Sequence, residues 1–552
     1  MSFGSKKLSG LLLIAASASA YTWPDPQLDE LESLVYDQHG FNSRGILAGA
    51  LDPCSRFNFG STVNRSNVAD WIRTAYHDMA THNVEDGTGG LDASIQFEQD
   101  RAENAGDGFF NSIRHLSLGI TRYAGVADLI ALGAKTAIEQ CGGPKVPFRG
   151  GRVDATVPNN PGVPEPQQGL DSHIAAFARQ GFTQTEMITL VACGHSFGGV
   201  QHSAFPDTVP LPDGVDDVSQ TFDSTPFNFD NAIAFEYVHG TTNNPLIVGH
   251  NDTTNSDKRI FGSDGNATMA SFAASPDLFK STCGTLFARM LDTVPKDVQL
   301  TEVIEPLPVK PQTMLLTYMG DGTLKLSGQV RFWDTAESTS RSAKIVWADR
   351  AGKTDTSYTD VLSTNADMVA SALNGGNFSV LWYNVGPIDK NFSVLEETAG
   401  ISKFWFEIDE GDGSGVRTED QNGVGFVLQD SVMLADSSCE ITSSSGSSSN
   451  ATIDIAVRAD IQPSRVYIEY DLFNTAPSGG SYTTVNTTDA QPASGPSKRA
   501  SSAYNIWTLQ LSDSILTLSL PRTINIAVDA GDRKITTASF APFSLLAGKQ
   551  CK

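Results

Sequence analysis

Positive charge and long apolar runs are both scarce in this chain of 552 residues. Its 38 Lys and Arg residues stand against 63 Asp and Glu residues, which gives a formal net charge of −25 at pH 7. So acidic a surface disfavours nucleic acid and anionic membranes as partners. Beyond the N-terminus, no segment is long and apolar enough to cross roughly 30 Å of hydrocarbon. We therefore expect no nucleic-acid partner and no membrane partner.

The N-terminus carries the pattern of a secretory signal peptide. Lys6 and Lys7 precede a short apolar run, Leu8 to Ala16, and small residues follow up to Ala20. Because the run is too short for a membrane anchor, we expect residues 1–20 to be cleaved and the protein to be secreted and extracellular. Glycosylation sequons fit this route, at Asn64, Asn251, Asn266, Asn377, Asn391, Asn450 and Asn486.

The length predicts two or three domains. Residues 21–305 alternate amphipathic helical patterns with loops rich in Gly, Pro and Asn, so an almost entirely α-helical domain is expected. Short alternating segments such as Phe404 to Ile408 follow, and these are typical of β-strands. They form two similar runs, 306–440 and 450–552, on either side of a serine-rich joint. The predicted fold is a multidomain one, a mainly α domain followed by two tandem all-β, sandwich-like units.

Helix starts in the first domain can be placed from capping residues. Ser66 or Asn67 is the expected N-cap of one helix, and Thr183 opens a capping box before another. Ser275 precedes a third helix, predicted over Pro276–Leu291.

Two histidine motifs carry the strongest chemical signal. Arg73 and His77 are four residues apart and share one face of a helix. His195 ends another apolar helical pattern, just before Gly198 and Gly199. One histidine beside a fixed cation and another alone at a helix end could face each other across a flat cofactor. Such an arrangement would bind haem iron on one side and cleave a peroxide on the other.

Further segments accompany these motifs in a fixed order, namely Gly89–Ile95, Asn104–Gly106, Gly151–Ala155, Val163–Pro166, Phe222–Asp230 and Ser263–Asp264. Together they resemble the plant–fungal–bacterial haem peroxidase superfamily, in particular secreted fungal members such as the manganese and lignin peroxidases. The resemblance implies a mainly α haem peroxidase domain that holds haem b and two Ca²⁺ ions and reacts with hydrogen peroxide and a reductant.

On the distal side, the resemblance assigns catalysis to Arg73, His77 and Asn104. His77 would act as general base, Asn104 would accept its remote N–H, and Arg73 would stabilise charge on the breaking O–O bond. Tyr76 stands where the family has Phe or Trp. It could pack over the haem or be oxidised itself, and we favour packing.

On the proximal side, His195 is the expected axial ligand of the iron. Asp264 is expected to accept the other ring N–H of His195 and to increase its basicity. Phe222 lies where the intracellular peroxidases have a tryptophan.

Two oxygen-rich sets are expected to bind calcium beside the two histidines. The distal set is Asp78, the Gly90 carbonyl, Asp92 and Ser94. The proximal set is Ser196, Asp223, Thr225, the Asn228 carbonyl and Asp230. The alternative for each set is a turn with solvated aspartates.

Six cysteines in an oxidising compartment favour disulfides. The resemblance pairs Cys54 with Cys141. Cys439 and Cys551 both lie in the C-terminal region and are expected to pair by elimination. Two residues within apolar helical patterns are expected to be buried free thiols, Cys193 and Cys283.

The specialised donor sites of the family look incomplete. The three manganese-binding carboxylates correspond to Ser66, Asp70 and Gln201, the surface tryptophan of lignin peroxidases to Leu190, and the ascorbate-binding arginine to Ala204. We therefore expect small aromatic, phenolic donors to react at the haem edge. The alternative is a catalytically weak peroxidase-like scaffold whose β-domains bind cell-wall or carbohydrate ligands.

Overall fold

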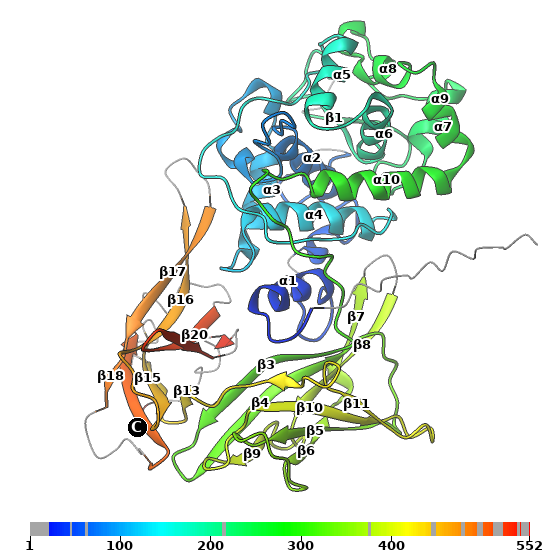
Figure 1. Ribbon diagram of the computed structural model, residues 1–552. Helices are drawn as coiled ribbons and strands as arrows, with labels where there is room; N and C mark the ends of the chain where they lie inside the picture. Colours follow the sequence, from blue (N-terminus) through cyan, green and yellow to red (C-terminus); the bar gives the residue numbers. More distant parts are fainter. Residues whose placement is uncertain are drawn as a thin grey trace, which may run out of the picture.

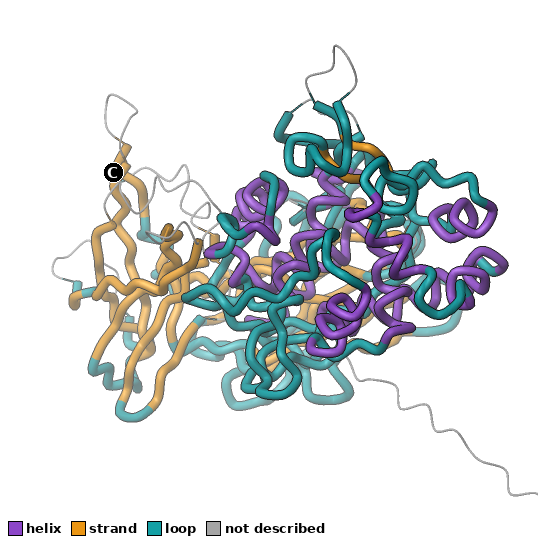
Figure 2. Tube along the Cα trace, turned by 90° about the horizontal axis from the view of Figure 1, so that it is seen from above, coloured by secondary structure: helices purple, strands orange, loops and turns teal. Residues whose placement is uncertain are grey.

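A helical half and a β-rich half follow each other along the chain and lie side by side (Figures 1 and 2). This computed structural model describes residues 21–44, 47–60, 64–211, 217–373, 377–442, 449–475, 481–493, 501–511, 523–537, 541–542 and 551. The predicted signal peptide lies outside these ranges. Within them, none of the helices has the length and apolar character that crossing a membrane requires.

The helical half confirms the predicted α-rich domain. Its helices are α1 (Pro26–Tyr36), α2 (Asn67–Met79), α3 (Gly108–Leu116), α4 (Val126–Gln140), α5 (Leu170–Arg179), α6 (Gln184–Gly194), α7 (Ala232–His239), α8 (Ser256–Phe261), α9 (Ala267–Ala274) and α10 (Pro276–Leu291). Strands β1 (Gly199–Gln201) and β2 (Ser219–Thr221) form a small antiparallel pair. Short 3₁₀ turns include η2 (Ser94–Phe97) and η3 (Ala102–Asn104).

Capping side chains begin the helices where the sequence predicts. The Ser66 hydroxyl accepts a hydrogen bond from the backbone N–H of Ala69 at 3.3 Å, which makes Ser66 the N-cap of α2. Thr183 and Glu186 form the predicted capping box of α6. Ser275 caps α10, whose first residue is a proline. These local contacts place the starts of the helices that form the site.

The β-rich half begins at Val309 and contains the predicted strands. In chain order these are β3 (Val309–Tyr318), β4 (Thr323–Phe332), β5 (Ser342–Ala348), β6 (Thr359–Ser363), β7 (Val369–Leu373), β8 (Asn377–Val385), β9 (Ser393–Glu396), β10 (Lys403–Asp409), β11 (Val416–Glu419), β12 (Phe426–Val427), β13 (Val432–Ala435), β14 (Cys439–Thr442), β15 (Ser449–Arg458), β16 (Arg465–Thr475), β17 (Ser481–Asp489), β18 (Gln491–Pro492), β19 (Tyr504–Leu511), β20 (Thr523–Ala530), β21 (Arg533–Thr536) and β22 (Ala541–Pro542).

Backbone pairing joins the two predicted β units. Strand β13 pairs in parallel with β3 and antiparallel with β15, so one sheet runs from the first unit into the second. Strands β14 and β15 form a hairpin across the predicted boundary between residues 440 and 450. A second sheet, ordered β17-β16-β20-β21, belongs to the C-terminal part. Alternation along each strand predicts the strands themselves, but it carries no information on which strands pair.

All six cysteines are paired in disulfides. The predicted pairs Cys54–Cys141 and Cys439–Cys551 are confirmed. The prediction of two free thiols is wrong, because Cys193 of α6 and Cys283 of α10 form a disulfide. Both residues are buried, as expected, but their helical patterns do not reveal that the two buried faces pack against each other.

Buried ion pairs join the two halves at α1. Glu32 of α1 bonds to both Lys310 of β3 and Arg331 of β4, and Arg331 also donates to Asp37 at 2.8 Å. All four side chains are buried. Just before α1, Trp23 packs in the β core against Phe404, with ring centroids 5.6 Å apart. The N-terminal segment is therefore part of both halves.

The C-terminal sheet contacts the helical half at a second place. Arg122, between α3 and α4, donates from Nε to Asp471 of β16 at 2.5 Å and from Nη1 to Glu469 at 3.2 Å. The backbone N–H of Ser481, at the start of β17, donates to Gln96 in η2 at 2.8 Å. The hairpin of β16 and β17 thus lies along the helical half, as Figure 1 shows.

Replacing Arg331 with Met should lower the free energy of unfolding by about 3–5 kcal/mol, the usual effect of leaving buried charge uncompensated. The change removes the cation shared by Glu32 and Asp37. Denaturant unfolding of the full chain measures it. Arg465→Met is the matched control, because its ion pair with Asp489 is exposed and worth at most about 1 kcal/mol. Equal losses in the two variants would contradict the role of burial.

Candidate active site

A cavity of about 580 Å³ lies between α2 and α6. Arg73, Tyr76 and His77 line it from α2, and His195 lines it from the end of α6. Phe222, which follows β2, adds part of the proximal wall. The structure therefore brings the two histidine motifs to one cavity, as the sequence predicts.

His77 is held in a single orientation by Asn104. The Oδ1 atom of Asn104 lies 2.8 Å from Nδ1 of His77, and its Nδ2 donates to the Glu98 carbonyl at 2.9 Å. Since the amide N–H₂ already donates to Glu98, Oδ1 faces the ring and accepts a hydrogen bond from Nδ1–H of His77. Burial, together with the Arg73 cation, holds the pKa of His77 well below its ordinary value. His77 thus has a neutral ring with Nε2 available as a base.

Arg73 is fixed beside His77. Its guanidinium donates to the Ala105 carbonyl at 3.0 Å and lies 4.3 Å above the Phe109 ring. Burial lowers the pKa of Arg73 to about 10, so the side chain stays charged at neutral pH. The remaining guanidinium N–H groups are available to the cavity that Arg73 lines.

Tyr76 forms part of the distal wall. Its ring stacks on Phe177 with centroids 5.9 Å apart, and its hydroxyl lies 3.5 Å from Oε1 of Gln180. Burial raises the pKa of the phenol. The hydrogen-bond acceptor of the phenol is an amide oxygen, which is too weak a base to take its proton, and this favours the packing role.

His195 is positioned by three contacts. Its backbone N–H donates to the Val191 carbonyl at 2.8 Å, and its ring stacks on Phe222 at 4.1 Å between centroids. Nδ1 lies 2.9 Å from Oδ2 of Asp257, which also accepts from Asn244. Because Nδ1 is bound to a buried carboxylate, Nε2 is the nitrogen left for a metal.

The carboxylate behind His195 is Asp257, and the prediction of Asp264 in this role is wrong. Asp264 instead accepts hydrogen bonds from Ala267 and Thr268 at the start of α9. Both aspartates follow a serine, in 256–257 and in 263–264. The earlier pair lies in the first turn of α8 and is buried, whereas Asp264 follows that helix.

The distal calcium set lies together beside His77. Asp78 accepts from the backbone N–H groups of Ala93 and Ile95 at 2.7 and 2.9 Å. Asp92 and Ser94 share the amide of Asn159, and Gly90 lies in the same buried loop. Burial, and then repulsion between the two carboxylates, raises the pKa of Asp78 well above its ordinary value. A cation would relieve this repulsion.

Four members of the proximal set, Asp223, Thr225, Asn228 and Asp230, lie together after β2, whereas Ser196 follows His195. Thr225 bonds through Oγ1 to both Asp223 and Asp230, at 3.3 and 3.0 Å, and Asn228 lies in the same turn. Oδ2 of Asp223 is buried with no hydrogen-bond partner, and burial raises the pKa of this carboxyl to about 7. Ser196 donates its hydroxyl to the Cys193 carbonyl. Across the described ranges, no three His, Cys, Asp or Glu side chains cluster as a metal site, so each set would rely on hydroxyl and carbonyl ligands.

Known proteins match this half of the chain. The family model described as Peroxidase matches residues 57–275, which include both faces of the cavity. This segment is a haem peroxidase domain. Relatives include a WSC domain-containing protein of Arthroderma benhamiae, 39% identical over 60% of this chain and 46% of the relative. Another is the peroxisomal L-ascorbate peroxidase 5 of Arabidopsis thaliana, 27% identical over 34% of this chain and 64% of the relative. A third is the mitochondrial cytochrome c peroxidase of Cryptococcus neoformans, 32% identical over 23% of this chain and 35% of the relative.

The chain therefore spans less than two thirds of the length of each of these relatives. The residues of the cavity fit the haem that the family implies. A histidine with a free Nε2 and a buried carboxylate at Nδ1 suits an iron ligand, and the cavity lies between it and the opposite His77.

Several residues that support the site were not predicted from the sequence. Asp257 and Asn244 hold the proximal histidine, Gln180 meets Tyr76, and Asn159 bridges the distal set. Each of these contacts joins two residues that are 13 or more positions apart in the sequence. Local spacing gives no signal for such contacts.

Proposed function

We propose that this chain reduces hydrogen peroxide to water while oxidising small aromatic donors by one-electron steps. The observation that carries the proposal is the pairing of His77 with Asn104 and Arg73 on one face of the cavity and of His195 with Asp257 on the other. Haem b, held through Nε2 of His195, would supply the iron at which peroxide binds and the oxidising equivalents that the donors consume.

The chain's own side chains account for the proton movements. Nε2 of His77 accepts the proton of the incoming peroxide and returns it to the departing oxygen, which leaves as water. Arg73 stabilises the negative charge that develops as the O–O bond breaks. Asp257 accepts a hydrogen bond from Nδ1–H of His195 and so strengthens Nε2 as a ligand.

The peroxidase-like scaffold remains the second candidate. A binding scaffold has no need of Arg73, His77 and His195 in one cavity, and this favours the enzyme. Soret absorbance of the purified protein, followed by peroxide-dependent oxidation of a phenol, separates the two. A protein that binds no haem, or that binds it without turnover, would leave the scaffold as the better account.

We expect phenols and aromatic amines to be good donors and Mn²⁺ a poor one. Ser66 caps a helix, Asp70 is paired with Arg65 at 3.1 Å, and Gln201 bonds to an aspartate. A cation at Asp70 would have to displace Arg65. Steady-state turnover with each donor separately checks this. A catalytic efficiency for Mn²⁺ comparable to that for a simple phenol would contradict it.

We further propose that the two oxygen-rich sets bind Ca²⁺. Chelation should slowly inactivate the enzyme and shift its spectrum towards six-coordinate iron, because each set adjoins a histidine of the cavity. Activity, spectrum and bound calcium are followed together after addition of a chelator. Unchanged activity after verified loss of calcium would identify the sets as solvated turns.

We also propose that the protein is secreted. The signal-peptide pattern supports this, as does the pairing of all six cysteines, which suits an oxidising compartment.

A further inference from the structure

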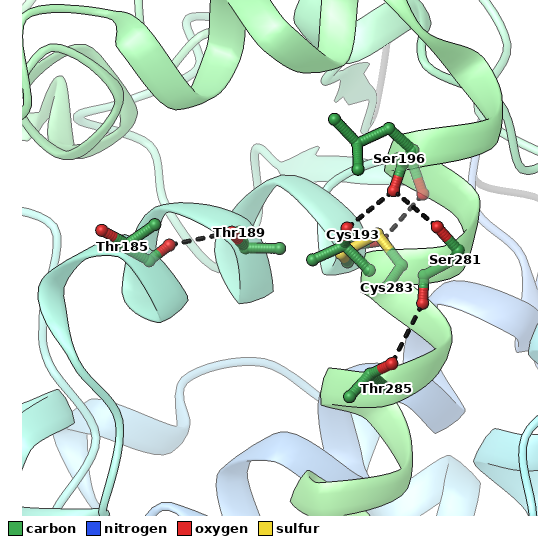
Figure 3. The surroundings of a disulfide bond; sticks show 9 residues. Thr185, Thr189, Cys193, Ser196, Ser281, Cys283 and Thr285 are labelled. Carbon is green, nitrogen blue, oxygen red and sulfur yellow. Dashed lines mark hydrogen bonds between the residues drawn. A yellow bond between two sulfur atoms is a disulfide. The ribbon is translucent and has the colours of Figure 1, made fainter. Parts of the chain in front are cut away.

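The disulfide between Cys193 and Cys283 joins α6 to α10 (Figure 3), and both helices line the cavity. Both cysteines are fully buried, and their Cα atoms are 5.6 Å apart. One turn before Cys193, α6 contributes Leu190 to the cavity, and one turn after Cys283, α10 contributes Phe287. The covalent bond therefore limits how far the two helices can separate at the cavity.

Cys193 lies within the last turn of α6, two residues before the axial histidine, and the helix ends at Gly194. His195 is the C-cap of α6, and one backbone hydrogen bond to Val191 continues the helical pattern there. The hydroxyl of Ser196 donates back to the carbonyl of Cys193 at 2.7 Å, as Figure 3 shows. The turn that presents the imidazole is thus tied to Cys193, and Cys193 is tied to α10.

Two disulfides divide the site into two loops. The loop closed by Cys193–Cys283, with a sequence separation of 90, contains the proximal residues His195, Phe222 and Asp257. The loop closed by Cys54–Cys141, with a separation of 87, contains the distal residues, including Arg73, His77 and Asn104. The distal residues Arg73, His77 and Asn104 thus lie within one covalent loop, and the proximal residues His195, Phe222 and Asp257 lie within the other.

We propose that Cys193 and Cys283 are positioning residues whose disulfide holds the axial histidine at its place below the cavity. The proposal rests on the proposed function, because it treats His195 as the iron ligand. Asp257 and Phe222 orient the ring of His195. The disulfide anchors the backbone next to His195. At this end of α6 the backbone N–H of His195 makes one hydrogen bond, to Val191.

The test compares Cys193→Ala/Cys283→Ala with Cys54→Ala/Cys141→Ala. The two loops are nearly equal in length, so losing either bond frees a similar amount of chain entropy in the unfolded state. The part of the stability loss that comes from the unfolded state is therefore similar in both variants. Two measurements report on position: hydrogen–deuterium exchange of residues 184–197, and the iron–histidine stretching frequency of the haem-loaded protein by resonance Raman spectroscopy.

We expect the Cys193/Cys283 variant to show faster exchange over 184–197 and a shifted or broadened iron–histidine band. The Cys54/Cys141 variant should leave both unchanged. The proposal is overturned if the two variants change these readouts equally, or if neither changes them. Should the alanine pair fail to fold, Cys193→Val/Cys283→Ala fills more of the vacated volume and takes its place.

Exchange over 184–197 is also measured in haem-free protein, which separates this proposal from the proposed function. A wild-type chain that binds no haem overturns the function, while protection of this segment by the disulfide would still support its positioning. A haem-binding variant with wild-type exchange and a wild-type iron–histidine band overturns the positioning role alone.

Discussion

His195→Ala is expected to lose stable haem binding. His195 lines the cavity at the end of α6. Its Nδ1 is bound to Asp257, so Nε2 is the ring nitrogen left to bind iron. Alanine at this position leaves the iron with no proximal ligand from α6. Soret absorbance and the haem content per chain measure the loss.

Asp264→Ala is the control for this variant, because Asp264 accepts hydrogen bonds from Ala267 and Thr268 of α9, whereas the carboxylate bonded to His195 is Asp257. It should keep haem and its wild-type spectrum. Asp257→Asn should keep haem but change the iron–ligand bond, since an amide is a weaker partner than a carboxylate for the Nδ1 proton. A His195→Ala protein with full haem content and an unchanged spectrum would overturn the proximal assignment.

His77→Ala should keep haem yet slow the reaction with peroxide by at least about 10²-fold, the lower end of what a positioned acid–base group contributes. The variant removes the base and leaves Arg73 in place. Stopped-flow mixing of the haem-loaded protein with peroxide measures the rate. His239→Ala is a suitable control, because that histidine is exposed and bonds to the carbonyl of Phe235. A wild-type rate for His77→Ala would refute its assignment as the base.

Most of the site could be predicted because its key residues lie in local motifs. Arg73 and His77 share a helical face through their spacing alone, and Ser66 and Thr183 start helices through contacts within one turn. The structure places Asn104 against His77 as the resemblance implies. Such features depend on a few neighbouring residues or on a motif that is read as a unit.

The errors concern contacts between segments distant in the sequence. Asp257 and Asp264 each follow a serine near a helix start, and only the packing of α8 against α6 brings Asp257 to the histidine. Cys193 and Cys283 each fit a buried helical face, and their helices meet only in the folded chain. Strand pairing is subject to the same limit, as with β13, which joins β3 to β15.

The two contact regions between the halves determine how the cavity would be oriented if the β-rich half bound to a surface. One is the buried charge cluster of Glu32 and Arg331, and the other is Arg122 with Asp471 of the β16–β17 hairpin. Because the halves are in contact at two separate places, they cannot rotate relative to each other as two domains joined by a single linker could. If the β-rich half rests on a surface, the mouth of the peroxidase cavity keeps one distance and one angle to that surface. Donors would then have to diffuse to a stationary opening.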